Sequence, residues 1–309
     1  MSQSLHSKSR YRTNNWKQYH AALKARGALT FWLDKGMSWF AASSGKRGRS
    51  PQFSDATIQF CLTIKNLFGL ALRQTPALCN CCWLCLDCHG LFQTSVRYVA
   101  DNAVWMCKWQ SPQFVWTEFA ARLHGHKVPG RRRMEVQKHG AERRRQRRNL
   151  HIGIDAQTLQ VRAICVTSNN VGDAVVVPHL LEQLPADESL LSVTGYGTYD
   201  TQPVYAAVMK RNAMPIIPPR KNARMRKGAA FAHRNAAIAA CRRFGRKLWK
   251  SWSGYHQPSL VETKMHCIKR LGERVMSRTF ERQVNELHIR AAILNRFTEL
   301  GCPQTVVVA

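Results

Sequence analysis

The sequence predicts a mixed α/β core that is preceded by a helical N-terminal region. Two strand-like runs, 150–154 and 160–166, flank the short segment 155–159, which is the pattern of a β-hairpin. Short apolar runs typical of strands then alternate with helical periodicity. Beyond His233 the chain has helical periodicity as far as about Leu300. Strands and helices that alternate in this way favour an α/β arrangement over an all-helical one.

The N-terminal region should contain three helical segments. Apolar residues recur at helical spacing over Asn14–Arg26, and Gly27 follows them. Ser54 can cap a second helix that Gly69 ends, and a third pattern follows over 70–78 with Arg73 exposed. Helix, glycine turn and helix suit a helix-turn-helix that contacts DNA, although the same pattern also fits an ordinary αα-hairpin.

The central elements follow one another at short intervals. Pro178 and Pro185 bracket a predicted helix, with Pro178 tolerated in its first turn. A strand, a second helix and a short last strand come next, and a break is expected near Gly254–Pro258. The predicted ranges are 177–184 for the first helix, 189–194 for the strand, 201–211 for the second helix and 215–217 for the last strand.

Charge is the most unusual property of the chain. Lys and Arg number 47 against 18 Asp and Glu, which gives a formal net charge of +29. A field of that strength attracts polyanions, and each phosphate that is neutralised releases a counterion. Nucleic acid is therefore the expected partner, and a ribosomal-type or merely basic soluble protein is the alternative. The candidate phosphate contacts are Lys46, Arg47, Arg49, Arg73, Arg143, Arg144, Arg147, Arg148, Arg220 and Lys221.

Neither a membrane span nor a secretory leader is expected. No apolar run approaches the roughly 18 to 20 residues that cross a bilayer, and the first residues are polar and basic. We therefore expect a cytoplasmic protein, with its 11 cysteines as thiols or metal ligands. The alternative of a non-enzymatic zinc protein rests on the cluster Cys82, Cys85, Cys88 and His89, whose close spacing makes tetrahedral ligation cramped.

The segment Tyr255–Lys269 carries candidate chemistry. A helix that begins near Ser259 would hold Glu262 in its first turn, near the positive end of the helix dipole. Lys269 follows two turns later on the same face. A carboxylate and a lysine arranged in this way suit metal-assisted phosphoryl transfer, although a glutamate can also do no more than stabilise its own helix.

This segment resembles the Y-x2-R-x3-E-x6-K signature of the DDE transposases, specifically the insertion-sequence-five family. Tyr255, Glu262 and Lys269 occupy the signature positions, while Pro258 replaces the arginine. The resemblance extends over most of the chain. Its other parts are Tyr19–Trp32 (YHAALKARGALTFW), Gly45–Gln74, Lys138–Gln157 (KHGAERRRQRRNLHIGIDAQ), Val171–Ala174, Ser192–Thr201, Arg220–Ala223 and Gly245–Ala309.

The resemblance implies a ribonuclease-H-like fold and DNA transposition as the activity. In that family two aspartates and one glutamate hold two divalent ions, for which Mg²⁺ is suited by its preference for hard oxygen ligands. The resemblance also implies a bacterial, nucleoid-associated protein. Its partners would be double-stranded DNA at the ends of an insertion sequence and further copies of the chain in a homo-oligomer. Glu262 would be the catalytic and metal-ligating glutamate here.

The chain departs from the family at both aspartates. The second one corresponds to Tyr196, and counting back from the Lys138 segment assigns the first to Arg122. We therefore expect impaired catalysis. The alternative is an active enzyme whose carboxylate site is rebuilt from Asp200 or Asp155.

The segment 79–124 lacks the family pattern and is rich in Cys and Trp. A stretch translated out of frame would have this appearance, and it would remove the first core strand together with the first aspartate. The expected organisation is a flexible basic tail (1–13), a helical DNA-binding region (14–78), this aberrant segment (79–124) and the transposase core (125–309).

Overall fold

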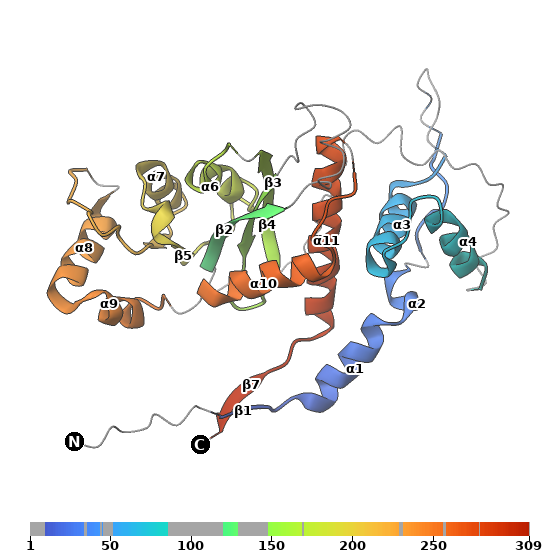
Figure 1. Cartoon of the computed structure of the whole chain (residues 1–309), viewed down its shortest axis with the longest axis horizontal. Helices are drawn as coiled ribbons and strands as arrows, with labels where there is room; N and C mark the ends of the chain where they lie inside the picture. The colour runs from blue at the N-terminus through green and yellow to red at the C-terminus, as the bar shows by residue number, and fades with distance from the viewer. Residues whose placement is uncertain are drawn as a thin grey trace, which may run out of the picture. The chain divides into compact units, whose positions relative to one another are not determined.

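A computed structural model of the chain describes residues 10–33, 36–43, 45, 52–85, 120–128, 148–168, 170–228, 231–255, 258–277 and 279–308 (Figure 1). The chain divides into two compact units, which are treated separately below. The first unit comprises Met1–Val96 together with Asn295–Ala309, and the second comprises Arg97–Leu294.

The first unit carries the three helices that the sequence predicts and one short helix that it does not. The predicted ones correspond to α1 (Trp16–Arg26), α3 (Asp55–Phe68) and α4 (Thr75–Cys85), and the additional one is α2 (Leu29–Trp32). Ser54 caps α3 as expected, because its side chain accepts a hydrogen bond from the backbone N–H of Thr57 at 3.2 Å. Gly69 ends α3 in the left-handed conformation with φ of 64°. The expected third helix is displaced, since α4 begins five residues later than predicted and extends beyond residue 78.

The two ends of the chain pair in a small antiparallel sheet, which the sequence did not predict. Strand β1 (Arg10–Thr13) pairs with β7 (Thr305–Val308), so the last residues of the expected flexible tail form a strand instead. Arg26 supports this junction by donating to the carbonyls of Phe297 and Gly301 at 3.1 and 2.7 Å. A pairing between segments almost 300 residues apart leaves no local pattern in the sequence.

The second unit is built on a five-stranded mixed sheet. Its strands are β2 (Ala120–Val128), β3 (Arg148–Ile154), β4 (Val161–Ser168), β5 (Ser192–Gly195) and β6 (Met214–Ile216). Their order is β4-β3-β2-β5-β6; β2, β3 and β4 are antiparallel neighbours, and β5 and β6 run parallel to β2. The hairpin expected around 155–159 is confirmed by the β3–β4 pair.

Strand β2 corrects one expectation from the sequence. The segment 79–124 was expected to have lost the first core strand, yet β2 begins at Ala120 and lies at the centre of the sheet. Its alternating small, basic and apolar residues gave no clear strand pattern. Pairing with β3 on one side and β5 on the other supplies hydrogen bonds that local propensity does not reveal.

Six α-helices of the described chain follow β4. They are α6 (Asp173–Glu182), α7 (Gln202–Lys210), α8 (Ala232–Phe244), α9 (Arg246–Trp252), α10 (Pro258–Arg270) and α11 (Phe280–Leu300), and a short 3-10 turn, η2 (Gly197–Tyr199), follows β5. Pro178 lies inside α6, because that helix starts earlier than predicted. Helices α6 and α7 pack with Val193 of β5 in an apolar core.

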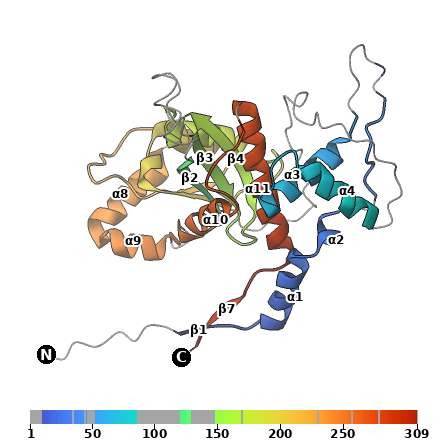
Figure 2. The ribbon, with the colours of Figure 1, turned by 45° about the vertical axis from the view of Figure 1, so that its right-hand side comes forward.

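Helix α10 packs against β2 and β3, and α8 contacts β6 (Figures 1 and 2). The unit is therefore a mixed α/β domain, as the sequence predicts. Among the helices of the described ranges, none is both long and apolar enough to cross a membrane.

Candidate functional site

The two expected aspartate positions are neighbours in the sheet. Arg122 of β2 is the parallel partner of Thr194 in β5, and Tyr196 lies two residues beyond Thr194, directly after the strand ends. The sheet register therefore brings the two positions together, although 74 positions separate them in the sequence. Thr194, which pairs with Arg122, is only 1% exposed, and its hydroxyl has no hydrogen-bond partner among the described residues.

The third position comes from α10. The phenol of Tyr196 donates a short hydrogen bond to Oε1 of Glu262. Tyr196 is half-buried and Glu262 is exposed, so the bond lies at the surface of the unit. Glu262 is the fifth residue of α10, which corrects the expectation that it lies in the first turn. A neutral phenol that donates to an ionised carboxylate forms a charge-assisted hydrogen bond.

The other two signature residues have different surroundings. Lys269 is half-buried in the last turn of α10, where a cation is favourable to the helix dipole. Tyr255 is 8% exposed and belongs to an apolar cluster with Trp249 and Ile216. Lys250 places its Nζ 5.1 Å from the centre of the Tyr255 ring. Packing is thus sufficient to account for Tyr255.

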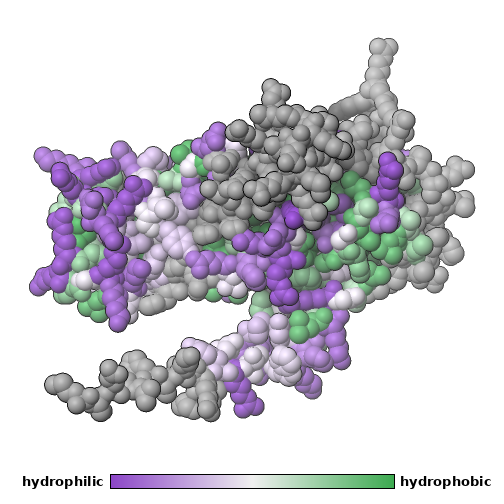
Figure 3. Space-filling view, viewed as in Figure 1, coloured by the Kyte–Doolittle hydropathy of each residue, from purple (hydrophilic) through white to green (hydrophobic). Residues whose placement is uncertain are grey.

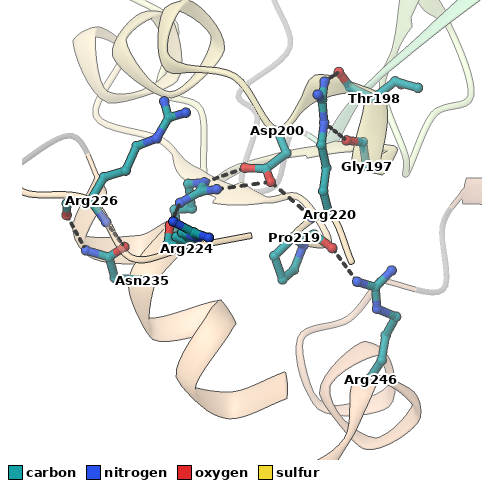
Figure 4. A network of polar contacts seen from close by, with 10 residues as sticks. Gly197, Thr198, Asp200, Pro219, Arg220, Arg224, Arg226, Asn235 and Arg246 are labelled. Carbon is teal, nitrogen blue, oxygen red and sulfur yellow. Dashed lines mark hydrogen bonds and ion pairs between the residues drawn. The ribbon is translucent and has the colours of Figure 1, made fainter. Parts of the chain in front are cut away.

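Asp200, one of the two carboxylates considered for a rebuilt site, is buried in an ion pair (Figure 4). Its Oδ1 accepts from Nε of Arg234 at 2.5 Å, and Oδ2 accepts from Nη2 of Arg234 at 3.4 Å and from the backbone N–H of Arg220 at 3.0 Å. Burial, and next to it the negative charge of Asp200, raises the pKa of Tyr205 well above its usual range. Asp200 therefore connects three parts of the unit, namely η2, the loop that follows β6, and α8.

Asp155, the other alternative carboxylate, closes the β3–β4 hairpin. It is 0% exposed and accepts hydrogen bonds from the backbone N–H groups of Gln157 and Thr158 at 3.0 and 3.3 Å. The hydroxyl of Thr158 donates to it at 2.5 Å. This is the arrangement of an Asx-type turn, so the carboxylate serves the fold locally.

A basic loop, 217–228, lies beside this ion pair and is held by arginine and asparagine side chains. Arg220 donates to the carbonyls of Gly197 and Thr198 at 3.4 and 3.2 Å, and Arg246 donates to the carbonyl of Pro219 (Figure 4). Asn235 of α8 bonds both backbone groups of Arg226, at 3.1 and 2.7 Å. The carbonyl acceptors are neutral, so these bonds fix the loop without cancelling the positive charge of Arg220 and Arg246.

The segment from the basic loop through α9 belongs to a long stretch without acidic residues. Between Thr201 and Val261 there is no Asp or Glu, and there are 13 Lys and Arg residues. They are Lys210, Arg211, Arg220, Lys221, Arg224, Arg226, Lys227, Arg234, Arg242, Arg243, Arg246, Lys247 and Lys250. Hydrophilic side chains cover much of the face over α8 and α9 (Figure 3). Arg220 and Lys221 were predicted as phosphate contacts. For the basic face of Arg242, Arg243, Arg246, Lys247 and Lys250, the sequence fits phosphate contact and simple solvation equally.

The remaining candidate residues have mixed outcomes. Arg73, Arg220 and Lys221 are exposed. Arg148 donates to Gln283 at 2.9 Å and lies 4.8 Å from the ring centre of Phe280, so it supports the start of α11. Outside the described residues lie Lys46, Arg47, Arg49, Arg143, Arg144 and Arg147, and with them Cys88 and His89 of the possible zinc set.

Two comparisons with family profiles identify the class of protein. A profile for the Transposase DDE domain matches residues 120–296, which is more than half of the chain and spans almost the whole of the second unit. A second Transposase DDE domain profile matches residues 24–89 in the first unit. No solved structure matches the chain. The chain belongs to the DDE transposase family, whose members act on DNA and generally use divalent metal ions.

Proposed function

We propose that this protein is a DNA-binding member of the insertion-sequence-five group of DDE transposases that has lost strand cleavage. The observation that carries the proposal is the bond between Tyr196 and Glu262. It lies where the family resemblance requires two carboxylates, and the sheet register adds Arg122 as the third position. The chain therefore keeps the framework of the site while two of its three acids are replaced.

A ribonuclease-H-like fold for the second unit is supported by the strand order. Three antiparallel strands, β2, β3 and β4, are followed by β5 and β6, which extend the sheet on the other side of β2 and run parallel to it. In this arrangement β2 and β5 are adjacent, so acids at the first and second positions would meet. The helix that carries the third acid in the family corresponds to α10, which carries Glu262.

The residues at the three positions do not fit a pair of divalent ions. Two Mg²⁺ ions held about 4 Å apart need several anionic oxygens to offset their repulsion. Arg122 contributes a cation, and Tyr196 contributes a phenol that is neutral at pH 7 and already donates to Glu262. The hydroxyl of Thr194 is neutral as well. Within the described residues, no three His, Cys, Asp or Glu side chains form a group that could bind a metal.

DNA binding is supported by the charge of the second unit. The stretch from Thr201 to Val261 is free of acids, and its loop 217–228 is held rigidly by backbone-directed side chains. Preorganised cations lose little entropy when they meet phosphates. We expect the double helix to contact this surface through its backbone, which gives affinity without strong sequence preference.

Strand cleavage tests the catalytic part of the proposal. The protein is incubated with the terminal inverted-repeat DNA of its own element and with Mg²⁺ or Mn²⁺. We expect intact DNA over a time in which an active family member cuts. Cleavage that the variant Glu262→Gln abolishes would overturn the claim of lost chemistry.

Fluorescence anisotropy with labelled duplex tests the binding part. We expect the affinity to fall steeply as salt rises, because binding releases counterions. Replacing Arg224, Arg226 and Lys227 by Gln should reduce the slope of log affinity against log salt by up to about three, since each lost phosphate contact removes about 0.9. The control changes three cations of the same unit that lie outside the stretch, Arg270, Arg274 and Arg282, and should leave the slope nearer to that of the wild type. An affinity that does not respond to salt would contradict DNA binding.

A further inference from the structure

An exposed apolar ridge extends from the last residue of α8 over α9. Its members are Phe244, Leu248 and Trp252, which follow one another at intervals of four residues and are 46%, 53% and 70% exposed. Phe244 and Trp252 meet edge to face with ring centres 6.1 Å apart. Trp249 of α9 is 7% exposed and packs in the apolar cluster with Tyr255, to which none of the three ridge residues belongs.

Among the described residues, the charged neighbours of the ridge in the sequence are cations. The guanidinium of Arg243 lies over the ring of Phe244, with 5.2 Å to its centre, and Arg246 and Lys247 are exposed in the first turn of α9. Within the sequence, the nearest acids are Asp200 and Glu262. Asp200 is buried in its ion pair, and Glu262 is bonded to Tyr196.

This combination selects the kind of occupant. A second copy of the chain would bring two sets of cations together at the ridge, which like-charge repulsion opposes. A DNA duplex meets cations with its phosphates but keeps the faces of its bases stacked inside. An unpaired strand offers both groups, because its bases stack on aromatic rings while its phosphates contact Lys and Arg.

We propose that the ridge is a stacking site for unpaired nucleobases of DNA. Trp252 and Phe244 supply the aromatic surfaces, Leu248 adds apolar surface on the same face of α9 as Trp252, and Arg243 and Lys247 meet the adjoining phosphates. The proposal rests on the proposed DNA-binding function and adds a substrate form to it. Since every base has an aromatic face, binding at the ridge should depend little on sequence.

Binding of two labelled DNAs at one salt concentration tests the proposal. One is a 15-nucleotide single strand of deoxythymidine, which forms no secondary structure, and the other is a 15-base-pair duplex. Trp252→Ala should weaken binding of the single strand about tenfold, since one base then loses its stacking partner. The conservative variant Trp252→Phe should restore most of it. Val175→Ala, which removes a 72% exposed apolar side chain elsewhere in the second unit, is the control and should change neither affinity much.

The duplex measurement separates failure of this inference from failure of the proposed function. Duplex binding that persists in Trp252→Ala while single-strand binding falls supports the stacking site. If Trp252→Ala weakens binding of the single strand and the duplex equally, or weakens neither, the stacking site is overturned. The proposed DNA-binding function of the wild type is unaffected by either result. If the wild type binds neither DNA, both proposals fail. Tight binding to vesicles that contain phosphatidylserine, lost in Trp252→Ala while single-strand binding is retained, would assign the ridge to an anionic membrane instead. Far-ultraviolet circular dichroism of each variant shows whether the fold is kept.

Discussion

Arg234 and Asp200 form a buried ion pair in which Nε lies 2.5 Å from Oδ1 and the side chains are 6% and 0% exposed. Nη1 of Arg234 also donates to the carbonyl of Arg224 at 2.7 Å. One arginine of α8 therefore connects the turn after β5 with the basic loop 217–228. Because the pair is buried away from water, removing one partner leaves the other as an uncompensated buried charge.

The first prediction concerns this pair. Arg234→Met should lower the free energy of unfolding by about 3–5 kcal/mol, measured by urea titration with tryptophan fluorescence. Arg224→Met removes an exposed arginine of the same loop and should change it by less than about 0.5 kcal/mol. The double variant Asp200→Asn with Arg234→Met should recover part of the loss. Equal stabilities for Arg234→Met and Arg224→Met would show that the pair does not stabilise the unit.

The second prediction concerns the replaced acids. Arg122→Asp combined with Tyr196→Asp should create a site that binds Mn²⁺, because the sheet register and α10 bring these two positions and Glu262 together. Electron paramagnetic resonance of free Mn²⁺ measures the binding directly and requires no catalysis. Adding Glu262→Gln should abolish it. Stoichiometric Mn²⁺ binding by the unaltered protein would contradict the prediction.

Much of the fold was visible in the sequence where the pattern is local. The β3–β4 hairpin, the cap at Ser54 and the helices after His233 follow from periodicity and turn chemistry, which act within a few residues. The β1–β7 sheet and strand β2 were missed because their hydrogen bonds join segments distant in the sequence. Pattern alone does not specify such pairings.

The site was predictable only in part, for the same reason. Family resemblance assigned the positions Arg122, Tyr196 and Glu262, but no sequence rule indicates that the phenol donates to the glutamate. Asp200 follows Tyr196 by four residues, which made it a candidate substitute metal ligand. Its partner, Arg234, is 34 residues away in a different element, so no local pattern reveals the ion pair. The exposure of the ridge was not predictable either, because helical periodicity alone does not distinguish which face is covered.

The third prediction concerns the cap of α3. Ser54→Ala should lower the free energy of unfolding of the first unit by about 1 kcal/mol, because the backbone N–H of Thr57 then loses its acceptor. Ser54 also donates to the carbonyl of Ser38, which the alanine leaves without that donor. Hydrogen exchange of the amides in α3 measures the effect locally. Ser54→Asp keeps an acceptor at the cap and should retain more protection than Ser54→Ala; equal exchange in all three proteins would contradict the capping role.

The fourth prediction concerns pH. His288 of α11 is half-buried, and desolvation lowers its pKa below the usual value of about 6.5. Its Nδ1 is buried without a hydrogen-bond partner among the described residues, so a proton on that nitrogen would meet no acceptor there. The unfolded chain therefore binds a proton at a higher pH than the folded chain does. Stability from the neutral ring is complete above about pH 6.5 and is lost as the pH falls toward the lowered pKa of the folded state.

His288→Gln tests this dependence, because it replaces the ring with a side chain that does not titrate. The free energy of unfolding of both proteins is measured by urea titration between pH 8 and pH 5. The difference between wild type and variant should be constant from pH 8 to about pH 6.5 and should then shift against the wild type. Each unit by which burial lowers the pKa contributes at most about 1.4 kcal/mol to that shift. A difference that stays flat down to pH 5 would mean that His288 gains its proton as readily in the folded protein as in the unfolded chain.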